Sequence, residues 1–130
     1  MLNHGDNAMN LLQQAESLED YWTPRVVARL NGQFVKVAKV KGQLAWHKHD
    51  NEDEMFLVLK GRLDIEFEDR ATVHLAEGDF YVVAAGVMHN PVCDDDCLIA
   101  LFEPASTAHT GDRVTERTVS IDEQLNPHAR

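Results

Sequence analysis

The sequence predicts an all-β domain that folds as a sandwich or a barrel. From Arg25 onward, short runs of β-forming residues follow one another and are separated by turn residues at regular intervals. Residues 62–68 alternate without a break between apolar and charged side chains, which is typical of a strand with one buried face. Very little of the chain has a helical pattern. A chain of 130 residues is long enough to form one such domain with its own core.

Residues 1–24 are predicted to form a short N-terminal extension, with one or two helical turns in residues 11–18. The first two strands are predicted at residues 25–30 and 33–40. They flank Asn31-Gly32, a dipeptide that favours a tight hairpin turn.

A second hairpin is predicted from residues 55–59 and 62–68, which flank Lys60-Gly61. Between the two hairpins, residues 44–49 are predicted to form a separate strand. The remaining strands are expected in segments that are apolar and bounded by turn residues: 72–75, 80–83, 89–93 and 98–103. Residues 104–130 are predicted to be an extended C-terminal segment that packs on the barrel or on a dimer partner, with its last extended stretch at 113–121.

Asp94-Asp95-Asp96 is interpreted as a polar turn between the last two strands, with Cys93 and Cys97 on either side. Two cysteines do not make a disulfide framework. They could face each other across the turn, but two free, partly buried thiols are the favoured interpretation for a cytosolic protein. A third alternative is that the two cysteines together bind a metal ion.

The charge balance limits the classes of partner. Twelve Lys and Arg residues against 22 Asp and Glu residues leave a formal net charge of −10. Nucleic acids and anionic membranes both attract basic surfaces, so neither is expected as a partner. The sequence has no recognisable signal peptide and no apolar run of membrane-spanning length, so a cytoplasmic location is expected.

The residues that carry chemistry are His47, His49, Glu54 and His89. Side chains two positions apart on a strand point to the same face, so His47 and His49 are expected side by side. A carboxylate from the next strand would complete a set of two nitrogens and one oxygen, and a distant third histidine would hold an ion more firmly. Such a set suits a divalent transition metal and leaves coordination positions open.

These residues fall into two motifs, and through them the chain resembles the small single-domain cupins. The first motif is a glycine, a His-x-His pair, a glutamate and a second glycine, which here are Gly42, His47, His49, Glu54 and Gly61. The second motif corresponds to Gly78, Ala84-Ala85-Gly86, His89 and Cys93. Ala84 stands where the family usually has proline, and Cys93 where it usually has asparagine. The resemblance spans residues 25–103 and is strongest to the RmlC-like, mannose-6-phosphate-isomerase-like group.

The resemblance implies a double-stranded β-helix, which is a jelly-roll barrel, with a short N-terminal extension. It also implies that His47, His49, Glu54 and His89 bind iron, manganese, zinc, nickel or copper. The expected wall of the adjoining pocket consists of apolar side chains and one thiol: Phe56, Val58, Ile65, Phe67 and Cys93. Trp46 has the opposite parity to His47 and is expected to point outward.

Two functions remain open from the sequence. One is a metal-dependent enzyme, an oxygenase or an isomerase, that acts on a small oxygen-rich molecule. The alternative is a non-catalytic metal-containing module that binds or senses a small molecule. A homodimer is expected, because a small jelly roll leaves sheet edges and an apolar outer face to cover. Four further histidines are interpreted as bystanders: His4, His74, His109 and His128.

Overall fold

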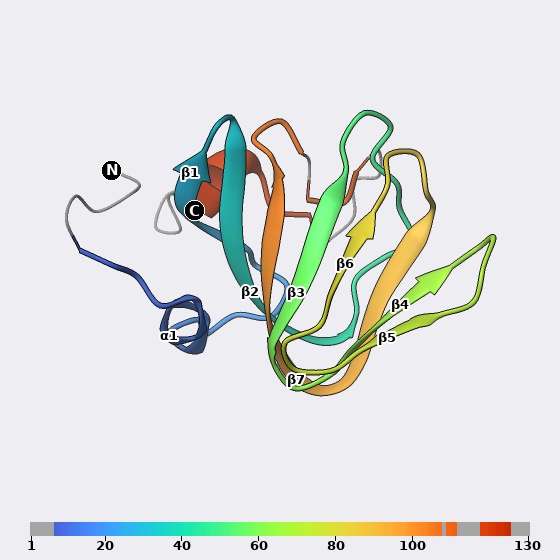
Figure 1. Ribbon diagram of the computed structural model, residues 1–130, viewed down its shortest axis with the longest axis horizontal. Helices are drawn as coiled ribbons and strands as arrows, with labels where there is room; N and C mark the ends of the chain where they lie inside the picture. Colours follow the sequence, from blue (N-terminus) through green and yellow to red (C-terminus); the bar gives the residue numbers. More distant parts are fainter. Residues whose placement is uncertain (1–6, 108, 112–117, 126–130) are drawn as a thin grey trace.

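The computed structural model describes residues 7–107, 109–111 and 118–125, and its regular structure is mostly β-strand with two short helices (Figure 1). The strands are β1 (Arg25–Leu30), β2 (Gln33–Gln43), β3 (Glu54–Lys60), β4 (Leu63–Phe67), β5 (Val73–Leu75), β6 (Phe80–Val83) and β7 (His89–Pro104). The helices are α1 (Leu11–Glu16) and α2 (Ile121–Leu125). None of the described helices is long and apolar enough to cross a bilayer.

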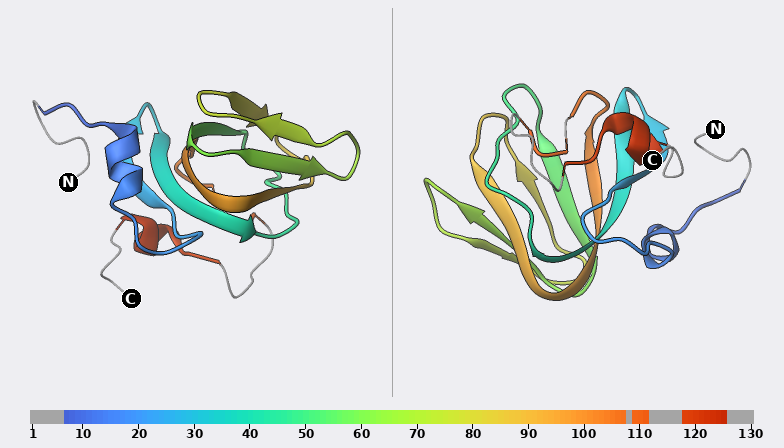
Figure 2. Two further views of the ribbon diagram at one scale, coloured as in Figure 1. Left: turned by 90° about the horizontal axis from the view of Figure 1, so that it is seen from below. Right: turned by 180° about the vertical axis from the view of Figure 1, so that it is seen from behind.

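Two long strands turn the sheet into a barrel. The strand order is β1-β2-β7-β3-β6, and β4 pairs with both β5 and β7. One half of β7 pairs with β4, and the other half lies between β2 and β3. The sheet therefore curves back on itself, and β4 and β5 close over the concave side (Figure 2). The all-β jelly-roll prediction is confirmed.

The predicted turn at Asp94–Asp96 is wrong, because β7 continues through these residues. In the pairing with β2, Val40 lies opposite Cys97 and Gly42 lies opposite Cys93. One residue of β2 therefore faces three residues of β7, and the exposed aspartates bulge out of the strand. Cys93 and Cys97 are free, buried thiols on this one strand.

One further predicted strand is wrong, and another lies mostly outside the described residues. Residues 44–49 form no strand, because only His47 makes a bridge, and its partner is His89. The extended stretch predicted at 113–121 lies partly outside the described residues. In its described part, residues 118–120 have no regular structure and Ile121 begins helix α2.

The first predicted hairpin and the N-terminal turn are present, but the second hairpin is wrong: β3 and β4 follow one another around Gly61 without pairing, because β3 pairs with β6 and β7 while β4 pairs with β5 and β7. Asn31 and Gly32 both have positive φ, 47° and 77°, as a two-residue turn between right-twisted strands requires. In α1, the side chain of Asn10 accepts a hydrogen bond from Gln13 N at 2.9 Å and caps the first turn.

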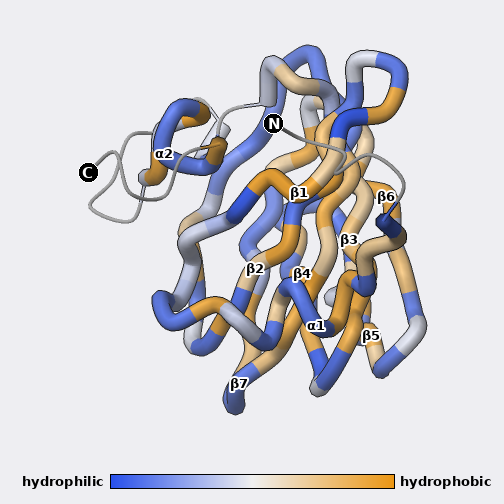
Figure 3. Tube along the Cα trace, turned by 90° about the vertical axis from the view of Figure 1, so that its left-hand side faces the viewer, coloured by the Kyte–Doolittle hydropathy of each residue, from blue (hydrophilic) through white to orange (hydrophobic). Residues whose placement is uncertain are grey.

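Apolar side chains pack on both faces of the curved sheet. The inner cluster fills the barrel and includes Ala38, Val40, Leu63, Ile65 and Ile99. The outer cluster lies under α1, where Ala15 and Leu18 pack against side chains of β1, β2 and β7: Val27, Val35, Val37 and Leu98. Hydrophobic segments accordingly follow the strands and α1, and the turns are mostly hydrophilic (Figure 3).

The tight approach of Gly61 to β7 generates a test of the barrel. Gly61 has a φ of 93°, and an added Cβ would lie 2.9 Å from the carbonyl oxygen of Asp96. Gly78 has a similar φ of 86°, but an added Cβ there would meet nothing within 4 Å. Both alanine variants should lose about 1 kcal/mol from the unfavourable φ, and Gly61→Ala should lose at least about 1 kcal/mol more from the contact. Urea unfolding measures both, and equal losses would contradict this account.

Candidate metal centre

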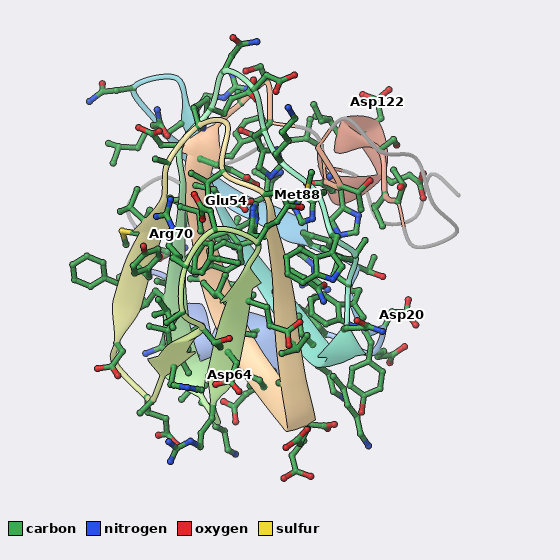
Figure 4. The ribbon with its side chains drawn as sticks, turned by 90° about the vertical axis from the view of Figure 1, so that its right-hand side faces the viewer. Asp20, Glu54, Asp64, Arg70, Met88 and Asp122 are labelled. Carbon is green, nitrogen blue, oxygen red and sulfur yellow. The ribbon has the colours of Figure 1, made fainter. Side chains whose placement is uncertain are left out.

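Four buried polar side chains from distant parts of the chain meet inside the barrel. His47 and His89 lie on facing segments, whose backbones exchange two hydrogen bonds of 2.9 Å. Glu54 is the first residue of β3, and His49 follows His47 by two positions, as the parity argument requires. The ligand atoms of the four residues all lie within 4.8 Å of one another. Figure 4 shows Glu54 in the upper part of the barrel, far from Asp64 near the lower end.

Backbone hydrogen bonds set the orientation of two of the rings. Nδ1 of His47 lies 2.8 Å from the carbonyl oxygen of Ala45, and Nδ1 of His89 lies 2.9 Å from that of Val87. A carbonyl oxygen only accepts, so each Nδ1 carries the proton and donates. The lone pair is therefore on Nε2 in both rings, which is the atom free to bind a metal.

Several of these buried atoms have no hydrogen-bond partner. Among the residues that the structure describes, no hydrogen-bond partner is present for either ring nitrogen of His49 or for Nε2 of His89, and all three atoms are buried. The nearest group is the carboxylate of Glu54, whose Oε1 lies 3.5 Å from His49 Nε2 and 3.7 Å from His89 Nε2. Leaving buried polar atoms unpaired costs roughly 1–3 kcal/mol each. A cation at the common centre would satisfy these atoms together.

The protonation of the cluster also suits a cation. Burial, and then the neighbouring His89, lower the pKa of His47 to about 4, so its ring is neutral near pH 7. Burial by itself would raise the pKa of Glu54, but its contacts with Glu103, His49 and His89 outweigh burial and hold it well below the usual range. The cluster therefore contains a neutral His47 imidazole beside an ionised Glu54 carboxylate.

A buried ion pair supports Glu54 from behind. Glu103 lies beside Glu54 on the neighbouring strand β7, and its Oε1 is 2.8 Å from Nζ of Lys36. Burial, and then the negative charge of Glu54, raise the pKa of Glu103 well above its usual range. Lys36 opposes this rise through its ion pair with Glu103, so one buried cation stabilises the two neighbouring carboxyl groups. Lys36 also donates to the side chain of Gln124 in α2, which ties the C-terminal segment to the barrel.

The dimensions fit a transition metal. Metal–nitrogen bonds to histidine are roughly 2.1 Å long, so ligands on opposite sides of an ion lie about 4.2 Å apart. The largest separation in the cluster, 4.8 Å, needs only a small inward movement. Three imidazoles and a carboxylate are ligands for iron, manganese, zinc, nickel or copper. The cluster could therefore hold a divalent metal.

A small cavity adjoins the cluster, and it provides about 30 Å³ of space for water centres, which is room for about two or three water molecules. Its wall includes His47, Glu54, Phe56 and His109. Of the predicted pocket residues, only Phe56 lies on this wall. The other four lie in the inner core cluster instead: Val58, Ile65, Phe67 and Cys93. They were expected on the wall because they face inward, but the barrel is packed below the cluster.

His109 is the residue that the sequence pattern did not identify, and its interpretation as a bystander is wrong. It belongs to no strand, so no parity argument predicts its direction. A turn at residues 109–111 brings it to the cavity. Among the other histidines, His74 is exposed and bonds Asp64, and His4 and His128 lie outside the described residues. Trp46 points outward with 37% of its surface exposed, as predicted.

Comparisons with known proteins agree with this architecture. The family model for the cupin domain matches residues 34–102. An uncharacterized protein of Bacillus subtilis (strain 168), YdbB, is 32% identical over 80 residues, which cover 62% of this chain and 71% of that protein.

Solved structures show the same fold. A cupin-2 domain containing protein from Shewanella frigidimarina is 36% identical and superposes with a TM-score of 0.70 over 74% of this chain and 93% of that one. A hydroquinone 1,2-dioxygenase from Sphingomonas sp. TTNP3 superposes with a TM-score of 0.66. It is 20% identical, and the match covers 75% of this chain and 32% of that one, so it shows likeness of fold alone. With its barrel, its two histidine motifs and these matches, the chain belongs to the cupin domain family.

Proposed function

We propose that this cupin binds one divalent transition metal through His47, His49, Glu54 and His89. The observation that carries the proposal is the set of buried, unpartnered nitrogens of His49 and His89 beside an ionised carboxylate. Burying polar atoms without a hydrogen-bond partner in an apolar barrel is unfavourable, so these nitrogens are expected to bind a group such as a metal ion. Iron, manganese, zinc, nickel and copper all suit this ligand set.

We further propose that the metal's open positions bind a small oxygen-rich molecule. Four protein ligands would leave positions of a six-coordinate ion open, and the cavity is lined by two of these ligands, His47 and Glu54. A bound divalent ion would supply Lewis-acid or oxygen-activating chemistry there. The cavity walls are mainly apolar, which restricts the polar contacts of the molecule to the metal and a few side chains. Oxygenase and isomerase chemistry both fit this arrangement.

The size of the cavity favours a second candidate, a non-catalytic module in which the metal binds or senses a small molecule. Room for about two or three water molecules is less than most substrates need. In this candidate the metal and its ligand would stabilise a conformation, and no reaction would follow.

Removing one ligand tests the metal site. His49→Ala should abolish the binding of one metal ion per chain, because it removes one of the four proposed ligands from the centre of the cluster. The barrel should remain folded, since His49 lies outside the strands. Metal analysis of protein purified without chelator measures the occupancy, and circular dichroism checks the fold. His74→Ala, at an exposed histidine on β5, is the matched control and should keep full occupancy. Full occupancy in His49→Ala would refute the assignment.

Oxalate, a small bidentate oxygen ligand, tests the open positions. It should bind to the metal-loaded protein with measurable heat and should not bind to His49→Ala, because the metal supplies most of the attraction. Calorimetry with Mn²⁺-loaded protein gives the affinity. Equal binding to both proteins, or binding to neither, would exclude the open positions and leave a structural metal.

We also propose that two copies of the chain associate through β6. This strand is the last in the sheet order, and its side chains Phe80 and Val82 are 62% and 47% exposed. An uncovered apolar edge strand favours association. Light scattering at low micromolar concentration should give the mass of a dimer, and Phe80→Lys should shift it toward a monomer. A wild-type protein that is a clean monomer under these conditions would contradict the proposal.

A further inference from the structure

His109 shares the cavity with two of the proposed metal ligands but does not belong to their cluster. It lines the wall together with His47 and Glu54. The group of atoms within 4.8 Å of one another contains His47, His49, Glu54 and His89, and not His109. His109, His47 and Glu54 therefore border the same cavity, where one small molecule could contact all three.

The hydrogen bond of the ring defines which nitrogen carries its proton. Nδ1 of His109 accepts a hydrogen bond of 2.9 Å from the backbone N–H of Val119. An accepting Nδ1 has its lone pair occupied and no proton, so a neutral ring must carry its proton on Nε2. Within the part of the chain that the structure describes, no hydrogen bond to Nε2 is present.

The surroundings keep the ring neutral. Burial, and then the positive charge of Lys36, lower the pKa of His109 to about 4. Near pH 7 the ring therefore offers one N–H group and no charge. A neutral donor does not compete with a cation for the carboxylate of Glu54, and it attracts oxygen atoms.

The turn that carries His109 is held firmly. Thr110 and Thr118 join their hydroxyl groups at 2.7 Å, next to the bond between His109 and Val119. Gly111 has a φ of 59°, and an added Cβ would collide with the carbonyl group of Lys48, between the two histidines of the first motif. Because the turn packs this closely against the ligand segment, the position of the His109 ring relative to the cluster is defined.

From these contacts we propose that His109 is a specificity-determining residue whose Nε2–H donates a hydrogen bond to an oxygen atom of the small ligand in the cavity. The assignment rests on the proposed function, because the ligand is the molecule that the metal's open positions would hold. It would add a polar contact to those that the metal supplies. A ligand with an acceptor oxygen on that side is preferred over one with an apolar group there.

Two substitutions separate this role from a merely structural one. His109→Asn keeps an acceptor near the position of Nδ1, so the bond from Val119 can persist, but it removes the group that reaches toward the cavity. His109→Gln places an amide N–H near the position of Nε2 and removes the acceptor for Val119. If His109 only anchored the C-terminal segment, Asn would be the better replacement; if it donates to the ligand, Gln is.

The experiment measures metal content and the affinity for oxalate in Mn²⁺-loaded wild-type, His109→Asn and His109→Gln proteins. All three should bind one metal ion per chain. His109→Asn should bind oxalate about tenfold more weakly than wild type, the usual effect of losing a hydrogen bond to a charged acceptor, and His109→Gln should stay within about threefold.

The outcomes that overturn the inference are distinct from those that overturn the metal site. Wild-type oxalate affinity in His109→Asn, with normal metal content, would overturn the role of His109 alone. A loss in His109→Gln as large as or larger than that in His109→Asn would also overturn it, because anchoring would then explain the effect. Absence of metal from the wild-type protein would overturn the proposed function, and this inference with it.

Discussion

The burial of ionisable side chains inside an apolar barrel is the constraint on which the rest of this structure depends. His47, His49, Glu54 and His89 are all buried, and so are Lys36 and Glu103 behind them. Unpaired charges in such a place cost several kcal/mol each, so every group needs a partner or must be neutral. Lys36 pairs with Glu103, and the imidazole of His47 is neutral. The remaining negative charge and the unpartnered nitrogens face one another at a single point.

Pairing between segments that are distant in the sequence brings these side chains together. The bridge between His47 and His89 joins segments that are forty-two positions apart, and β7 holds Glu103 beside Glu54. Neither contact involves a regular hairpin. The candidate site therefore depends on the closure of the whole barrel. Close contacts such as that of Gly61 with β7 hold this closure together.

The C-terminal segment has a larger part in the site than its irregular structure suggests. Gln124 reaches Lys36, Val119 bonds His109, and Gly111 packs against the backbone of Lys48. These contacts connect the wall of the cavity to the ion pair behind Glu54. Changes in this segment should consequently alter what the cavity accepts while leaving the metal ligands themselves in place.

The sequence by itself predicted the all-β class and the pairing of His47 with His49 from local periodicity, and its resemblance to the cupins implied the jelly-roll barrel and the four candidate ligands. The alternation of residues 62–68, the Asn31-Gly32 turn and the spacing of His47 and His49 are visible without long-range information. Tertiary structure decided the rest. The aspartates at 94–96 have the composition of a turn. The strand continues through them because the residues before and after them, Cys93 and Cys97, both pair with β2. The inward-facing Val58, Ile65 and Phe67 pack as core because the barrel is filled below the cluster. His109 reaches the cavity from an irregular turn, where no periodicity predicts the direction of a side chain.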